Sequence, residues 1–163
     1  MRETRVRGKA LNKGRFSNGY AFDEGDWIVG TLLITSTSTF EFLVAPYSCE
    51  KEYYILSDND SIKFMKNGGA KVFPIRVDPT TVGFATDLLD RNEVTLSEGD
   101  VFVTRYENVP NYKYVVRFYP EHVAYMARCI ETNCIHYLCD FKSSEIEIIG
   151  DVHDNPELLE ADK

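Results

Sequence analysis

The chain has 163 residues, of which 44% are hydrophobic and 27% are charged. A chain of this length and composition can bury roughly 70% of the surface that its unfolded form exposes, which excludes a disordered protein. Its formal net charge of −8 opposes a phosphate backbone, so the composition as a whole also argues against DNA binding.

Positive charge is gathered at the start of the chain and negative charge at its end. Residues 1–15 hold six basic side chains against Glu3, whereas residues 140–163 hold eight acids against two lysines. We interpret the basic segment as a solvated strand that pairs with acidic surface of its own chain or of a neighbouring subunit, and a local phosphate contact is the alternative. The candidate ligand or interface residues are Arg5, Arg7, Lys9 and, on the next predicted strand, Trp27.

The N-terminal arginines are followed by no apolar signal segment. The longest apolar stretch, from Trp27 to Ile34, is too short to span a bilayer. We therefore expect a protein that is neither exported nor inserted into a membrane, and that stays in the cytoplasm.

Short runs rich in β-branched and aromatic residues, bounded by Gly, Asn, Asp or Pro, recur along the chain and predict strands. Together they favour an all-β fold with minor helical content, built as small barrel-like or SH3-like sheets in two halves. The predicted strands are Trp27 to Thr35, Thr39 to Val44, Glu52 to Leu56, Ala70 to Phe73, Val101 to Tyr106, Tyr112 to Tyr119, Val123 to Ile130, Ile135 to Phe141 and Glu145 to Ile149.

Helical signals are confined to the segment Thr80 to Leu89 and to a short turn after Asn155. There Asn155 is the expected N-cap, and Pro156 fills the first helical position, where a missing amide hydrogen costs nothing. The polar stretch from Ser57 to Gly69 predicts a hinge or hairpin. We therefore expect an N-terminal β region over 1–70 and a C-terminal one over 71–163.

One tripeptide occurs twice, each time directly before a predicted strand. Glu-Gly-Asp at Glu24 to Asp26 precedes Trp27, and the same tripeptide at Glu98, Gly99 and Asp100 precedes Val101. In both cases the glycine can take a positive φ angle, so each tripeptide predicts a turn that starts a strand.

Fingerprints of common enzymes are missing from the sequence. It has no G-x-S-x-G, no G-x-x-x-x-G-K-[ST] and no G-x-G-x-x-G, and its histidines lack the H-x-x-x-H spacing of zinc hydrolases. We therefore expect no enzyme activity and no cofactor.

A cluster of soft ligands raises the alternative of a metal site. Cys129, Cys134, His136 and Cys139 fall within a few residues of one another, but their spacing matches no common zinc motif. On a strand, Cys134 and His136 would share one face while Cys139 points to the other. Free, buried thiols are therefore the favoured interpretation, and a metal held by Cys134, His136 and Cys139 is the alternative.

Three sets of motifs resemble those of the YopX family of phage and prophage proteins. The first set, Arg7-Gly8-Lys9 with Gly25 to Gly30, is similar to the family's opening R-G-K and G-E-W-V-Y-G. The second set comprises Val77 to Gly83, with Asp78, Pro79 and Gly83, and Glu98 to Val101; it resembles V-x-P-E-T-V-G and E-G-D-I-V. The third set, Glu145 to Val152 followed by Asp154 to Leu159, is similar to the ending E-V-I-G-N-I-x-x-N-P-E-L-L.

The chain departs from the family pattern in two places. Between the central motifs, the family pattern is T-G-L-K-D-K-N-G. The corresponding residues of this chain, Thr86 to Glu93, include neither glycine, so we expect a turn of different shape there. Residues 16–24 resemble an insertion, and the cysteine cluster is not a family feature.

The resemblance implies a largely β protein that assembles into homo-oligomers and has no established activity, and it carries over no active-site residues. It also implies a phage origin, with the cytoplasm of a bacterial host as the location. The favoured hypothesis is a non-catalytic oligomeric accessory protein that binds a host or phage macromolecule. The second is an oligomeric sponge, with an anti-defence role, that holds a small anionic or nucleotide-like ligand. A DNA-binding regulator rests on the basic segment alone and is the least favoured.

Overall fold

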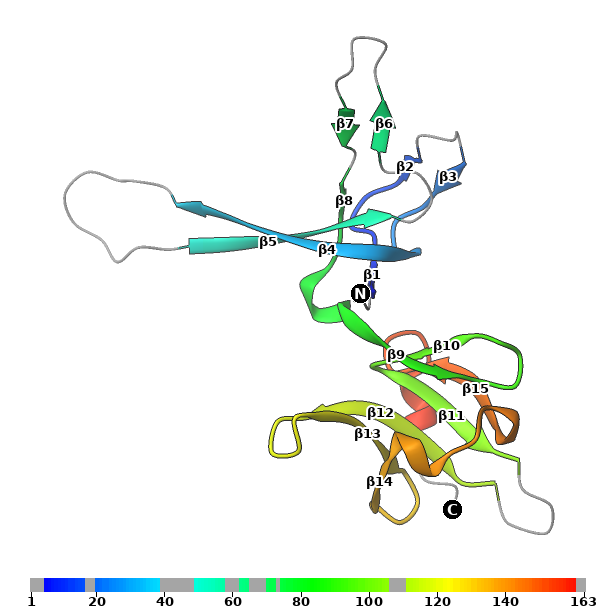
Figure 1. Cartoon of the computed structure of the whole chain (residues 1–163). Coiled ribbons are helices and arrows are strands. Elements are labelled where there is room, and N and C mark those ends of the chain that lie inside the picture. Colours follow the sequence, from blue (N-terminus) through cyan, green and yellow to red (C-terminus); the bar gives the residue numbers. More distant parts are fainter. Residues whose placement is uncertain are drawn as a thin grey trace. The chain divides into compact units, whose positions relative to one another are not determined.

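The chain folds into two compact units, Met1–Val82 and Gly83–Lys163, each with its own antiparallel sheet (Figure 1). The structure is a computed structural model, and it describes residues 5–16, 20–38, 49–57, 62–64, 70–72, 74–105 and 111–160. Within these ranges, no helix has the length and apolar character needed to cross a membrane. The sequence-based domain boundary near residue 70 stays a prediction.

The first unit is built on a sheet with the strand order β1-β4-β5-β8, and two small hairpins, β2 with β3 and β6 with β7, accompany it. Its elements are β1 (Val6–Lys9), β2 (Gly14–Arg15), β3 (Ala21–Phe22), β4 (Trp27–Ser38), β5 (Cys49–Ser57), β6 (Ile62–Phe64), β7 (Ala70–Val72), β8 (Ile75–Arg76) and the 3-10 helix η1 (Pro79–Thr81).

One face of this sheet forms the core of the first unit. Val6, Ile28, Ile55 and Val77 are fully buried there. A Cβ atom on Gly8 would lie 3.2 Å from Val77, so the glycine lets the chain segment that carries Val77 pack closely on β1.

The second unit contains an open sheet with the order β14-β13-β12-β11-β15 and a hairpin of β9 with β10. Its elements are β9 (Gly83–Leu89), β10 (Thr95–Ser97), β11 (Asp100–Thr104), β12 (Lys113–Tyr119), β13 (Ala124–Cys129), β14 (Ile135–Tyr137), β15 (Ile146–Asp151) and the 3-10 helices η2 (Leu138–Asp140), η3 (Ser143–Glu145) and η4 (Pro156–Leu159).

Aromatic side chains fill the core on one face of the second sheet. The ring of Phe102 stacks on Tyr114 at 5.3 Å between centroids, and Phe141 meets both rings edge-on. Each such side chain contributes about 1.5–3 kcal/mol to stability through burial. Leu96 and Ile146 complete the buried cluster from other strands.

The opposite face of the second sheet is covered by the end of the described chain. Strand pairing puts Val101, Val115 and Gly150 together on this face. A Cβ atom on Gly150 would lie 2.8 Å from the side chain of Leu158. On the same face, the Lys113 amine donates a hydrogen bond of 2.8 Å to the carbonyl of Glu160. Both faces of this sheet are therefore packed.

The predicted strands agree well with this structure. All of them that fall on described residues overlap an observed strand, and the stretch from Thr39 to Val44 lies outside the described residues. Strand β6, inside the predicted hinge or hairpin stretch, pairs with β7 directly after it, which confirms a hairpin. The two Glu-Gly-Asp turns are also confirmed, because Gly25 and Gly99 both have φ of +88°.

Several predictions were wrong. In the part of the chain that is described, neither sheet closes into a barrel. The strand predicted from Ile135 to Phe141 is also shorter than expected, because β14 ends at Tyr137 and the chain turns into η2. The segment from Thr80 to Leu89 is helical only at Thr80 and Thr81, in the 3-10 helix η1. Gly83 then begins strand β9, and the hydroxyl of Thr86 donates to the carbonyl of Leu96 at 2.7 Å across the β9–β10 hairpin.

The C-terminal turn differs from the prediction in its cap. Pro156 begins a 3-10 helix as expected, but the Asn155 side chain makes no cap hydrogen bond. Instead it lies against Gly150 and donates to the Glu157 carboxylate at 3.4 Å. Close packing against Gly150 therefore takes the place of capping at this position.

Candidate functional site

Strand β1 presents cations on one face of the first sheet and apolar residues on the other. Arg7 and Lys9 share the face that carries Trp27, which is directly opposite Lys9 in the strand register. The guanidinium carbon of Arg7 lies 4.5 Å from the centroid of the indole ring, and the amine of Lys9 lies 5.3 Å from it. Each cation–π contact contributes about 0.5–1 kcal/mol at an exposed site.

We call Arg7, Lys9 and Trp27 the Trp27 cluster. It unites three of the four residues that the sequence suggested as ligand or interface residues, and the fourth, Arg5, lies exposed just before β1. The exposed side chain of Val29 pairs with Arg7 across β1 and β4. The cluster thus combines two positive charges with apolar surface, an arrangement suited to carboxylate or phosphate groups.

The segment after β8 fixes the position of Lys9. The backbone amide of Asp78 donates to the carbonyl of Lys9 at 2.9 Å, and the amide of Lys9 donates to the hydroxyl of Thr81 at 2.9 Å. The Asp78 carboxylate caps the turn at Pro79 by accepting bonds from the amide and hydroxyl of Thr80. This motif therefore holds the strand that carries the Trp27 cluster.

Gly83, at the end of the same motif, allows a close approach of two chain segments in the second unit. A Cβ atom at this position would lie 2.7 Å from the carbonyl oxygen of Glu98, a separation that real side chains do not adopt. This glycine therefore allows a contact that a side chain would block.

The two Glu-Gly-Asp turns share more than their glycine conformation. In the first, the Asp26 carboxylate accepts a hydrogen bond of 2.8 Å from the amide of Asp23. In the second, the Asp100 carboxylate accepts one of 2.7 Å from the amide of Ser97. Each aspartate thus reaches back three residues, so the same local structure starts β4 in one unit and β11 in the other.

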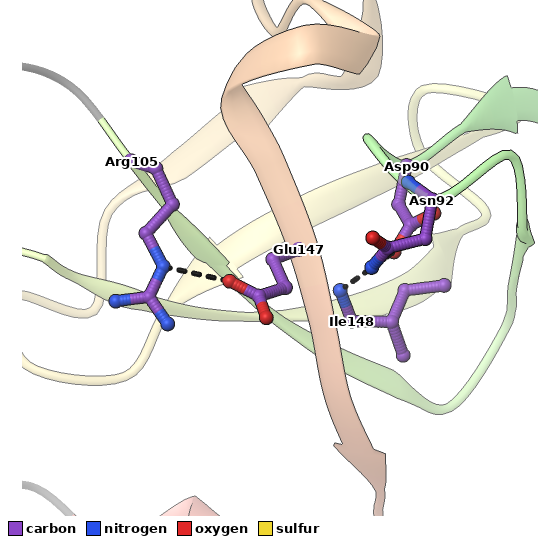
Figure 2. A network of polar contacts seen from close by, with 5 residues as sticks. All are labelled: Asp90, Asn92, Arg105, Glu147 and Ile148. Atoms are coloured by element: carbon purple, nitrogen blue, oxygen red, sulfur yellow. Dashed lines mark hydrogen bonds and ion pairs between the residues drawn. The ribbon is translucent and has the colours of Figure 1, made fainter.

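A polar network in the second unit was not anticipated from the sequence (Figure 2). The buried Asp90 carboxylate accepts hydrogen bonds from the amides of Asn92 and Val94 at 2.8 and 2.9 Å, and from the amide of Ile148 on β15 at 3.2 Å. On the other side of β15, Glu147 accepts a bond of 2.8 Å from the guanidinium of Arg105. The turn residues Asp90 and Asn92 were the only sequence signal of this network.

The hydrogen bonds also set the charge state of Asp90. Burial acts to raise the pKa of this carboxyl group, but the bonds from Val94, Ile148 and Asn92 to its charged form outweigh burial and lower the pKa. Asp90 is therefore an anion that holds the turn before β10 against β15.

The cysteine and histidine segment takes a different arrangement from a metal centre. All three cysteines are free thiols, and Cys129 is buried as expected. The expectation of burial was wrong for Cys134 and Cys139, which are exposed. The ring of His136 lies 5.6 Å from Tyr114, on the aromatic core side of the sheet. Over the residues that the structure describes, no three His, Cys, Asp or Glu side chains form a group that could hold a metal ion.

The fold and these contacts define an antiparallel β protein in two units, in which the motif at Asp78 and Thr81 holds the strand that carries the Trp27 cluster. Residues 38–160 match the profile of a protein family described as YopX protein. The chain belongs to the YopX family. The match includes the motifs at 77–83, 98–101 and 145–159, and the Trp27 cluster lies before it. No curated protein matches the chain.

Proposed function

We propose that the chain is a non-catalytic, oligomeric binding protein of a phage or prophage that acts on a host or phage macromolecule. The observation that carries this proposal is the Trp27 cluster, in which Arg7 and Lys9 lie on one indole ring beside the exposed Val29. Aromatic and cationic groups side by side on a half-buried surface are typical of protein interfaces. The partner is expected to present acidic groups to this surface.

The contacts of the family motifs support a binding role. The carboxylates of Asp78, Asp100 and Asp151 all accept hydrogen bonds from nearby backbone amides. Such hydrogen bonds stabilise turns, so they indicate a structural role for these motif residues. The proposal therefore places recognition on the Trp27 cluster, which the motif at Asp78 and Thr81 holds in position.

The assembly part of the proposal is tested by size-exclusion chromatography with light scattering. We expect a multiple of the single-chain mass at tens of micromolar, roughly the range in which specific assemblies persist. A single-chain mass at that concentration would contradict it.

The binding part is tested with matched variants of the tagged chain in extracts of infected cells. Arg7→Glu combined with Lys9→Glu reverses both charges of the cluster. Lys13→Glu reverses an exposed charge of the same basic segment, outside the cluster. We expect the wild type and Lys13→Glu to retain the same partner and the double variant to lose it. Equal retention by all three would remove the cluster from the interface.

The arrangement of Arg7 and Lys9 on one ring also favours a second candidate, a sponge for a small anionic or nucleotide-like ligand. A ligand present at 100 times its dissociation constant should add about 2.7 kcal/mol to the free energy of unfolding. Thermal unfolding with a panel of nucleotides distinguishes the two candidates. A shift that the double variant loses would favour the sponge, and no shift across the panel would favour the macromolecular partner.

A further inference from the structure

The two longest strands of the first unit extend beyond the rest of their sheet as a two-stranded ribbon. Along β4, the pairing with β1 covers the start of the strand, from Trp27 to Gly30, and β8 pairs with Tyr54 and Ile55 of β5. The pairing of β4 with β5 continues without a shift to Ser38 opposite Cys49. Figure 1 shows this ribbon reaching past β1 and β8.

The outer edge of β4 carries none of the features that protect strand edges. Over Thr31 to Ser38 its sequence is T-L-L-I-T-S-T-S, without proline or charge, and its register has no bulge. Among the described strands, none pairs with this edge beyond Gly30. A long, regular and uncharged edge is a template for pairing with another strand.

The partner strand β5 differs in this respect. Its outer part has the sequence Glu50-Lys51-Glu52, and Glu52 is held by an ion pair of 2.9 Å with Arg76. Charged side chains of this kind discourage edge-to-edge pairing. The two edges of the ribbon are therefore unequal, and β4 is the edge suited to an added strand.

Exposed apolar side chains lie on both faces of the ribbon next to this edge. Leu33 is 40% exposed and Ile34 is 49% exposed, and successive residues of a strand point to opposite faces. A strand added beside β4 would bring cross-strand neighbours to both side chains. Backbone hydrogen bonding and apolar burial would then favour the same contact.

We propose that β4 pairs antiparallel with β4 of a second copy of the chain, across a two-fold axis. This inference rests on the oligomeric part of the proposed function and names its contact surface. Identical strands that pair antiparallel make a self-complementary contact, which a two-fold axis allows. The stretch from Trp27 to Phe40 is the longest in the sequence without a charged residue. Two copies, each with a net charge of −8, therefore bring no charged side chains of these strands against one another.

The test places lysines on the proposed edge. Thr31→Lys combined with Ile34→Lys adds charge at two exposed positions of β4, and Tyr20→Lys is the control, because Tyr20 is 74% exposed in the same unit outside the ribbon. By light scattering, we expect the mass of the edge variant to fall to half that of the wild type or less, with an unchanged circular dichroism spectrum. The control should keep the wild-type mass.

A second measurement on the unmodified protein covers the case in which the edge variant fails to fold. Hydrogen exchange reports on the backbone amides of residues 31–38. Among the described strands of a single chain, none pairs with those that point away from β5. We expect these amides to be protected in the assembled protein and to exchange faster after dilution. Equal and fast exchange at all concentrations would overturn the proposed contact.

The outcomes separate this inference from the proposed function. A wild type that assembles, with an edge variant of the same mass and no protection of residues 31–38, overturns the β4 contact and leaves the oligomeric proposal standing. A wild type that is a single chain overturns both.

Discussion

The carboxylate of Asp90 accepts a hydrogen bond from the backbone amide of Ile148, a residue 58 positions further along the chain. This bond links the turn between β9 and β10 to the last strand of the second sheet. The same carboxylate satisfies the amides of Asn92 and Val94. One carboxylate thus accepts hydrogen bonds from three backbone amides that would otherwise lack an acceptor.

Removing this carboxylate should weaken the second unit. Asp90 is 3% exposed, so Asp90→Ala would leave several backbone amides without their acceptor in a buried place. We expect the free energy of unfolding to fall by about 1–3 kcal/mol, measured by urea denaturation. Replacement of the exposed Glu121 by Ala is the control and should change it by less than about 0.5 kcal/mol. A similar small effect of Asp90→Ala would contradict the role of this network.

Stability should also depend on pH through Asp90. Its pKa is lowered in the folded chain from the ordinary value of 3.8, so the unfolded chain takes up the proton more readily. The stabilising contribution is therefore complete above that ordinary value and is lost as the pH falls through it toward the lower, folded pKa. We expect the difference in unfolding free energy between the wild type and Asp90→Asn to shrink between about pH 6 and about pH 3. A difference that stays constant over this range would speak against a lowered pKa.

Glu93 is a position where glycine should stabilise the protein. It has φ of +63°, in the left-handed region that disfavours side chains, and the family pattern T-G-L-K-D-K-N-G that Thr86 to Glu93 resembles has a glycine here. A left-handed conformation costs a residue other than glycine about 1–2 kcal/mol, part of which the greater freedom of glycine in the unfolded chain offsets. We expect Glu93→Gly to raise the melting temperature by a few degrees. Glu121→Gly, at an exposed position outside this turn, should not raise it.

Gly83 should tolerate no side chain. A Cβ atom there would collide with the carbonyl of Glu98, which belongs to the Glu-Gly-Asp turn before β11. We expect Gly83→Ala to lower the free energy of unfolding by about 1–3 kcal/mol, in the range of other overpacked sites. Gly25→Ala provides a comparison, because a Cβ atom there has open space and only its φ of +88° opposes the change. Denaturation of both variants shows whether collision costs more than backbone strain.

The cysteines should differ in reactivity. Cys134 and Cys139 are exposed, whereas Cys129 is 2% exposed. We expect brief alkylation of the folded protein to modify Cys134 and Cys139 and to spare Cys129 until urea is added, because reagents reach buried thiols slowly. Peptide mapping by mass spectrometry identifies the modified sites. Early labelling of Cys129 would mean that the core around it opens readily.

Short sequence patterns correctly predicted strands and turns that depend mainly on neighbouring residues. Strands such as β4 and β12 follow from runs of β-branched and aromatic residues, and the turns at Gly25 and Gly99 follow from a tripeptide that favours a positive φ. The resemblance to relatives pointed to Gly83, whose role proved to be a close contact.

Features that depend on distant residues could not be derived in this way. The bond between Lys9 and Thr81 joins residues 72 positions apart, and nothing near either residue indicates the other. The segment after Pro79 was mistaken for a helix because its apolar residues fit either period over so short a stretch, and the pairing of β9 with β10 decides the outcome. The sequence suggested the three residues of the Trp27 cluster, but only the pairing of β1 with β4 shows that they lie together.

Residues 155–160 cover Val101 and Val115, and this contact determines the order in which the two units can fold during translation. The first unit has all its strands once residue 82 has emerged, and it can begin to fold while translation continues. The second unit cannot bury both sides of its sheet until Leu158 and Glu160 have left the exit tunnel. A nascent chain stalled before that point would expose Val101 and Val115 on one face of the second sheet, and chaperones bind exposed apolar surface of this kind.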